Sequence, residues 1–188
     1  MAEIGDDERH VIRVAVWSGF TGPDEADDLI ADLLLDEPEL DEDALHAFAA
    51  AEFARKAADE ASWPATTDCD RLDVAFAALA DAGILALHNA GFTVADGHVE
   101  AAEALARVPK DRFLGYCFYH AQDVERAVEG APLWIAFDHI RGDVPEKAHV
   151  ARLVVSALEA AGLAPCWDGD PGRRIVLERF DWKRRFAG

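Results

Sequence analysis

The first third of the chain repeats apolar residues at helical spacing. In the segment TGPDEADDLIADLLLDEP they recur three or four residues apart between Pro23, a favourable first helical residue, and Pro38, which ends the helix. The segment LDEDALHAFAAAEFARKAADEASWP repeats this pattern and stops before Pro64. The stretch RHVIRVAVWSGF fits neither the helical nor the strand period cleanly, and we assign it to a helix. We therefore predict that residues 1–64 are α-helical.

From residue 66 onward, glycine and proline divide the chain into alternating strands and helices. Short apolar runs predict five strands, at 84–89, 113–120, 132–139, 164–168 and 173–178, the last two around the turn DGDPG. Helical patterns occupy 66–83, 96–109, 121–130 and 145–162. Thr67 and Asp96 are the expected N-caps of the first two of these helices.

This order of elements predicts an α+β fold. Residues 65–188 would form a ferredoxin-like (split βαβ) mixed sheet with one inserted helix, and residues 1–64 an acidic helical segment packed on it as one body. Right-handed crossovers make strands 84–89 and 113–120 parallel. We expect the third strand to lie between them, which would place their C-terminal ends about 10 Å apart on one edge of the sheet.

Polar side chains stand at both of these strand ends. His88 and Asn89 end the first run, and His120, Gln122 and Asp123 end or follow the second. Imidazole and carboxylate groups that meet at a sheet edge can act as bases, proton donors or binding groups. We take these five as candidate ligand-binding residues and assign no catalytic residue. The alternative is structural: His120 or Asp123 caps the following helix, and His88 with Asn89 satisfies a turn.

Three other polar motifs have a structural explanation. In TTDCD the two aspartates oppose thiolate formation at Cys69, and the polar residues suit a helix cap. WDGDPGRR lacks the spacing of a calcium loop and suits a hairpin turn. FDHIRGD, with Asp138, His139 and Asp143, suits a loop before a helix, at the opposite edge from His120. We expect no metal and no cofactor, since no phosphate-binding loop, dinucleotide fingerprint or hydrolase motif is present.

The charge is the most unusual property of the sequence. The net charge is −19 over 188 residues, and residues 1–64 contribute −14 of it, with 18 acidic and 4 basic residues. Such a surface repels phosphate backbones, so nucleic-acid binding is disfavoured and a basic protein partner fits better. Adaptation of the surface for solubility is the alternative explanation.

The C-terminal stretch RRIVLERFDWKRRF carries six basic residues among aromatic ones. Stacking and charge would suit nucleic acid. Pairing with the acidic helices, within the chain or in a homodimer, is the interpretation that we favour.

The cysteines and the apolar runs bear on the cellular compartment. Cys69, Cys117 and Cys166 are far apart and form no CxxC motif, which fits a reducing cytoplasm better than a disulfide framework. The N-terminus lacks the pattern of a signal peptide, and no run approaches the ~20 apolar residues of a membrane helix. We expect a cytoplasmic protein that does not cross a membrane.

Several motifs resemble a bacterial protein family known as a domain of unknown function. They are WPATTDCDRLDVAFAALADAGILALHNAGF, GYCFYHAQDVERAV, LWIAFDH and APCWDGDPGRRIVL, with DWKRR near the end. The resemblance runs from Val11 onward and implies a bacterial cytosolic protein without implying an activity. At fold level only, the βαββαβ order and acidic surface are similar to the small protein inhibitor of ribonuclease E.

Two functions follow as expectations. The first is a non-enzymatic interaction or regulatory protein, inhibitor- or immunity-like, that uses its acidic helices against a basic partner. The second is a small-molecule- or metal-dependent enzyme that uses His88, His120 and Asp123 at the shared sheet edge.

Overall fold

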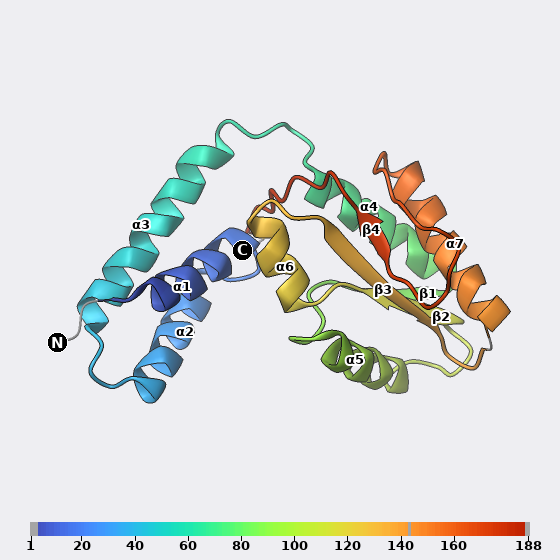
Figure 1. Ribbon diagram of the computed structural model, residues 1–188, viewed down its shortest axis with the longest axis horizontal. Helices are drawn as coiled ribbons and strands as arrows, with labels where there is room; N and C mark the ends of the chain where they lie inside the picture. The colour runs from blue at the N-terminus through green and yellow to red at the C-terminus, as the bar shows by residue number, and fades with distance from the viewer. Residues whose placement is uncertain (1–3, 143, 187–188) are drawn as a thin grey trace. The chain divides into compact units, whose positions relative to one another are not determined.

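The computed structural model describes residues 4–142 and 144–186 and divides the chain into two compact units (Figure 1). The first unit comprises residues 1–67 and 183–188, and the second comprises residues 68–182. The sequence pattern predicts a boundary after residue 64 and assigns residues 65–188, including the C-terminal tail, to the second domain. In the structure the C-terminal tail belongs to the helical unit, where the guanidinium of Arg185 donates to the carbonyl of Pro64 at 2.9 Å and that of Arg184 lies over the ring of Phe20.

In its described residues the first unit contains three helices, α1 (Asp6–Ser18), α2 (Pro23–Asp36) and α3 (Glu42–Glu60). The assignment of the ambiguous first stretch to a helix is confirmed, and α1 ends at Gly19, whose φ of 76° is left-handed. Pro23 is the first residue of α2, as predicted. The N-cap of α3 is Asp41, whose carboxylate accepts from the backbone N–H of Ala44 at 3.2 Å.

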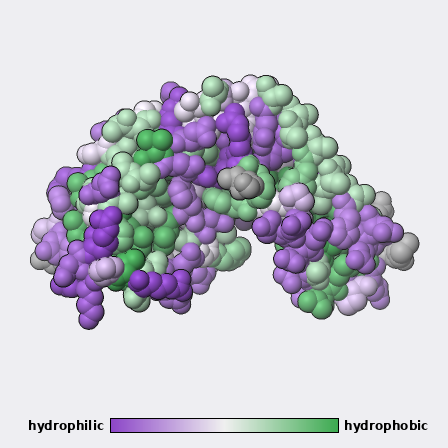
Figure 2. All heavy atoms as spheres, turned by 180° about the vertical axis from the view of Figure 1, so that it is seen from behind, coloured by the Kyte–Doolittle hydropathy of each residue, from purple (hydrophilic) through white to green (hydrophobic). Residues whose placement is uncertain are grey.

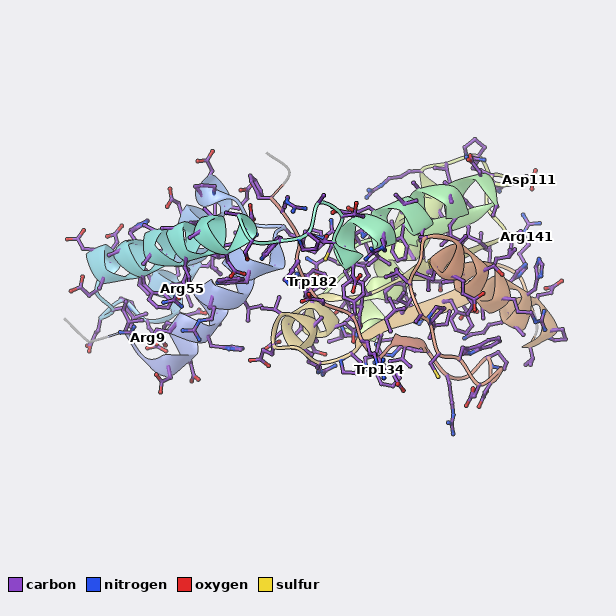
Figure 3. All side chains as sticks on the ribbon, turned by 90° about the horizontal axis from the view of Figure 1, so that it is seen from above. Arg9, Arg55, Asp111, Trp134, Arg141 and Trp182 are labelled. Carbon is purple, nitrogen blue, oxygen red and sulfur yellow. The ribbon has the colours of Figure 1, made fainter. Side chains whose placement is uncertain are left out.

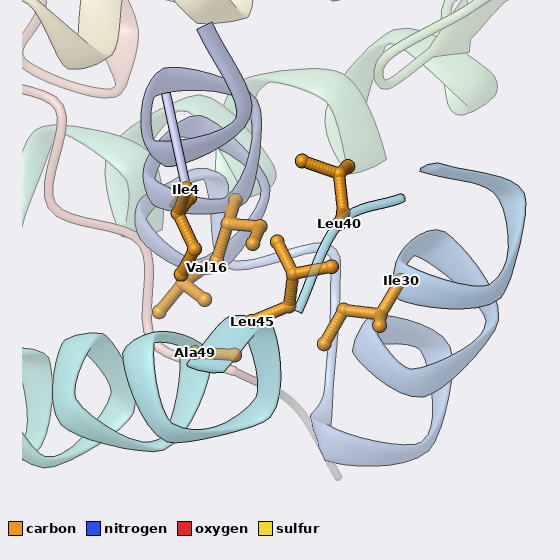
Figure 4. Close-up of a cluster of buried hydrophobic side chains, with 7 residues drawn as sticks. Ile4, Val16, Ile30, Leu40, Leu45 and Ala49 are labelled. Atoms are coloured by element: carbon orange, nitrogen blue, oxygen red, sulfur yellow. The ribbon is translucent and has the colours of Figure 1, made fainter. Parts of the chain in front are cut away.

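The core of this unit is a cluster of small and branched apolar side chains from all three helices (Figure 4). Val16 and Leu45 are fully buried in it. Two charged side chains are buried as well, and both are paired. Glu52 accepts from the indole N–H of Trp17 at 2.9 Å, and Lys56 donates to the carbonyl of Val16 at 3.0 Å.

The second unit is a four-stranded mixed sheet with helices. Its elements in chain order are α4 (Asp68–Asp81), β1 (Ile84–Leu87), α5 (Val94–Ala106), β2 (Gly115–Phe118), α6 (Ala121–Val128), β3 (Leu133–His139), α7 (Val144–Ala160) and β4 (Ile175–Leu177). Helices α4 and α7 pack together over one face of the sheet, and α5 lies on the other face (Figure 1). The predicted α+β class is confirmed.

The strand order differs from the prediction. The order is β1-β2-β3-β4, with β1 and β2 parallel and the other two neighbouring pairs antiparallel. The expected position of the third strand, between the first two, is therefore wrong, and the ferredoxin-like arrangement is not confirmed. The run at 164–168 does not form a strand and makes only an isolated bridge, between Cys166 and Val176.

Two local features position the elements around β1 and β2. The N-cap of α5 is Thr93 rather than the expected Asp96, which sits at the third helical position and accepts from the Thr93 backbone N–H at 2.9 Å. Gly97 then allows α5 to lie close to the sheet, because a Cβ at this position would overlap the ring of Phe118. The loop before α5 is thereby held beside the C-terminal end of β2, where Ala121 donates to the carbonyl of Gly91 at 3.0 Å.

Candidate functional site

The five predicted site residues lie at one edge of the sheet. Strands β1 and β2 run in the same direction, as predicted, but as direct neighbours, with Leu87 level with Phe118. The backbone N–H of Ala90 donates to the carbonyl of Tyr119 at 2.9 Å, so the two chains stay paired just beyond the strand ends. The polar residues that follow both strands are therefore close in space.

The side chains of His88 and His120 nevertheless leave the sheet on different faces. Extending the pairing by one residue places His88 level with Tyr119, and extending it by two places Asn89 level with His120. Because successive side chains of a strand alternate between the two faces, His88 shares a face with Tyr119, and His120 lies on the other. The pairing thus separates the imidazoles that we expected in one pocket.

His88 forms a polar chain with residues on the α4 side of the sheet. Its Nδ1 lies 2.8 Å from the hydroxyl of Tyr119, and its Nε2 lies 3.5 Å from a carboxylate oxygen of Asp73. The imidazole also packs on the ring of Phe76, with 4.6 Å between the ring centroids. The Tyr119 hydroxyl is thereby linked through one imidazole to a carboxylate that is about half exposed.

His120 belongs to a buried ion network on the opposite face. Its Nε2 lies 2.9 Å from a carboxylate oxygen of Asp123, and both side chains are almost completely buried. The guanidinium of Arg174 donates to both carboxylate oxygens of Asp123, at 2.9 and 3.1 Å, and Arg126 lies 3.7 Å away. Arg174 also lies over the ring of Trp134, which Figure 3 shows beside the sheet. Two cations thus neutralise the buried carboxylate.

The geometry assigns the proton of His120 to Nε2. A carboxylate oxygen 2.9 Å away accepts from this nitrogen, so the guanidinium of Arg174, 3.3 Å from it, is a contact rather than a donor to it. Nδ1 is then an acceptor, and no described residue donates a hydrogen bond to it. Burial lowers the pKa of His120; Asp123 opposes this shift, and Arg174 reinforces it. The imidazole is therefore neutral near pH 7.

Asn89 lies in the loop between β1 and α5, whereas Gln122 and Asp123 lie in the first turn of α6. Asn89 adopts a left-handed backbone conformation with φ of 50°, and its buried Oδ1 has no hydrogen-bond partner among the described residues. The backbone N–H of Gln122 donates to the carbonyl of Phe92 at 3.3 Å. His120 is the N-cap residue of α6, and the carboxylate of Asp123, at the third helical position, accepts from its backbone N–H at 3.4 Å.

A second imidazole–phenol pair joins α5 to the start of β2. Nδ1 of His98, on α5, lies 2.8 Å from the hydroxyl of Tyr116. Burial raises the pKa of Tyr116 to about 12, with Asp138 adding to the shift, and burial lowers the pKa of His98. Both groups are neutral near pH 7, so this pair is an uncharged hydrogen bond. The thiol of Cys117, beside it in the strand, is buried and has a raised pKa, so it is not a reactive nucleophile.

The residues of the remaining motifs make local contacts. Asp68 of TTDCD pairs with Arg71 at 2.7 Å, and the cap expected at Thr67 stays a prediction. In WDGDPGRR the carboxylate of Asp168 accepts from the backbone N–H of Asp170 at 3.0 Å and pairs with Arg173 at 3.1 Å. In FDHIRGD, His139 lies level with Gly115 at the start of β2, hence at the opposite edge from His120, and Asp143 lies outside the described residues. Within the described ranges no group of three His, Cys, Asp or Glu side chains could hold a metal ion.

Arg174, Tyr119 and Asp73 are the residues of this region that the sequence analysis missed. Arg174 lies 51 positions from Asp123, and no local pattern joins the two. One signal was available for the network: Asp123 stands beside Val124 on the buried side of a short helix, where an aspartate requires a cationic partner. The alternation along FLGYCFYH also places Tyr119 and His120 on different faces.

None of the helices in the described part of the chain is long and apolar enough to cross a membrane. A comparison with curated proteins gives no match, and no solved structure matches either, so the fold-level similarity to the ribonuclease E inhibitor stays without support. The model of one family, described as Domain of unknown function (DUF6891), matches residues 1–186. The match covers nearly all of the chain, and the protein belongs to this family.

Proposed function

We propose that this protein is a non-enzymatic interaction protein, of the inhibitor or immunity type, that binds a basic protein partner through the acidic surface of α2 and the start of α3. Between residues 14 and 54 the chain has no lysine or arginine. Ten of the eleven acidic residues from 24 to 43 are exposed. In the space-filling view this unit shows a purple, hydrophilic area beside paler apolar residues (Figure 2).

The observation that carries the proposal is a stripe of four aspartates along α2. Asp24, Asp28, Asp32 and Asp36 are all exposed and are spaced four residues apart, so they stand above one another on the same side of the helix. No ion pair joins any of them to another described residue. The stripe runs along nearly the full length of α2, whose 14 residues span about 21 Å at 1.5 Å per residue.

This stripe is unfavourable for the isolated protein. Like charges four residues apart destabilise a helix by about 0.2–0.5 kcal/mol per pair, and the stripe has three such pairs. Asp36 also lies in the last turn, where the helix dipole disfavours a negative charge. A partner that places lysine or arginine along the stripe would relieve this repulsion and gain long-range steering.

A titration with a short oligolysine peptide tests the proposal. We expect saturable binding that weakens steeply with salt, and a clearly smaller dependence on salt for the variant D28N/D32N/D36N. Isothermal titration calorimetry at several salt concentrations measures both.

The matched control removes the same charge from the second unit, in E103Q/E159Q/E178Q, three exposed glutamates. This control should bind oligolysine like the unchanged protein. Equal weakening in both triple variants would show that only net charge matters and would contradict the proposal.

The enzymatic alternative has less support from the geometry. His88 contacts Tyr119 on one face of the sheet, and His120 contacts Asp123 on the other, where Arg174 neutralises the carboxylate. The one observation in its favour is the acceptor Nδ1 of His120 that no described residue satisfies. If His120→Ala abolished an activity measured for the protein, this alternative would replace the proposal.

A further inference from the structure

A pocket lies at the edge of the sheet opposite to His120. It has a volume of about 280 Å³ and opens between the loop that leads into β2 and the loop that follows β3. Its lining combines basic side chains, one imidazole and several apolar side chains. Nothing in the proposed function uses this region, which belongs to the second unit.

The charge of the lining is opposite to that of the protein. Lys110, Arg112 and Arg141 face a single acid, Asp111, although the chain as a whole carries −19. Asp111 is almost fully exposed, and its carboxylate lies 3.8 Å from the guanidinium of Arg141; both residues are labelled in Figure 3. A salt bridge this exposed contributes little free energy. The guanidinium of Arg141 can therefore leave Asp111 and turn towards an anion.

His139 adds an imidazole to the three cations of the lining. Its Nδ1 accepts from the backbone N–H of Arg141 at 3.0 Å, which places the proton on Nε2. Glu146, the nearest acid on α7, lies 3.5 Å from Nδ1, too far to replace this bond. Because His139 lines the pocket, we take this Nε2–H as the donor that the imidazole offers to a ligand.

The rest of the lining is apolar. Phe113, Leu114 and Ile140 contribute hydrophobic side chains, and the guanidinium of Arg112 lies over the ring of Phe113, 5.1 Å from its centroid. This contact holds the cation at the pocket while leaving its N–H groups available. A concave apolar site with a few convergent donors is the usual form of a small-molecule site.

We propose that this pocket binds a small organic anion, a carboxylate or a phosphate monoester with an apolar body. Arg112 and Arg141 would bind the anionic group by charged hydrogen bonds, Lys110 would add attraction, and the apolar side chains would cover the body of the ligand. The acidic surface elsewhere on the chain would exclude anions, so the pocket is a local exception in the field of the protein.

Calorimetric titration of the full chain with phenyl phosphate and with benzoate tests the proposal and separates the two anion types. Benzyl alcohol, which is similar in shape and uncharged, is the ligand control. We expect saturable binding of at least one anion and none of the alcohol. Removing a guanidinium should weaken binding about tenfold or more, so R112Q/R141Q should lose most of the affinity.

The variant control is R107Q. Arg107 is as exposed as the pocket arginines, lies at the end of α5 and pairs with Glu103 at 3.6 Å, but it does not line the pocket. Its loss should change the dissociation constant by less than about threefold, since salt screens a charge outside the pocket. Absence of saturable binding by both anions, equal weakening in R107Q, or binding of the alcohol as tightly as the anions would each overturn the proposal.

Discussion

Replacing Asp32 by asparagine should stabilise the helical unit. Asp32 stands in the middle of the stripe on α2, four residues from Asp28 on one side and from Asp36 on the other, and all three are exposed. The substitution removes both like-charge pairs, each worth about 0.2–0.5 kcal/mol. Asparagine and aspartate have similar helix propensities, so this term nearly cancels. We therefore expect a gain of about 0.4–1 kcal/mol in the free energy of unfolding.

Urea unfolding at low salt measures this gain. With a slope of about 2 kcal/mol per molar urea, the midpoint should rise by about 0.2–0.5 M. The fluorescence of Trp17, which packs against the core of the helical unit, reports on that unit. At about 1 M salt the Debye length falls to ~3 Å, and the difference between Asp32→Asn and the unchanged protein should disappear.

Asp24→Asn is the internal control. Asp24 lies in the first turn of α2, where a negative charge gains about 0.3–1 kcal/mol from the helix dipole. Its loss offsets the relief of the single pair with Asp28, so no stabilisation is expected. An unchanged midpoint for Asp32→Asn would show that repulsion along the stripe does not destabilise the helix. A gain that persisted in high salt would show that the stabilisation has another cause than charge repulsion.

Three further predictions concern the second unit. Gly97→Ala should destabilise it by about 1–3 kcal/mol in urea unfolding, because the overlap with the buried ring of Phe118 outweighs a helix-propensity gain of about 1 kcal/mol; a more stable variant would contradict the packing. Asp123→Asn should cost about 3 kcal/mol or more by leaving Arg174 without its partner, and a double-mutant cycle with Arg174→Met should show coupling, so additive losses would refute the pair. Burial lowers the pKa of His120, so the unfolded chain binds more protons at this residue, and stability should fall as pH drops below about 6.5. His120→Gln should flatten this pH dependence of stability. An unchanged slope in the variant would contradict the lowered pKa of His120.

Local signals in the sequence predicted most of the helices and strands. Pro23 and Pro38 bracket α2 as expected because proline is tolerated in a first helical turn and cannot continue a helix. The error at α5 was a choice between two capping residue types three positions apart. Thr93 and Asp96 bond to each other reciprocally, and the first of such a pair is the cap.

The order of the strands could not be read from local patterns. A right-handed crossover makes β1 and β2 parallel whether or not another strand separates them. The relative direction of these strands was therefore predicted correctly, whereas their adjacency was not. Site prediction depends on still finer information. Which face His88 or His120 occupies depends on pairing to within a single residue, and long-range packing fixes that pairing.

The helical unit is built from both ends of the described chain, and this affects its synthesis. Its helices emerge from the ribosome first, but residues 183–186, which contact Phe20 and Trp63, are made after the whole second unit. At about 5–20 residues per second, the interval between residue 67 and residue 183 is roughly 6 to 23 s. During that time the aromatic rings of Phe20 and Trp63 lack these contacts, so the fold of the nascent helical unit is completed only when residues 183–186 have been made.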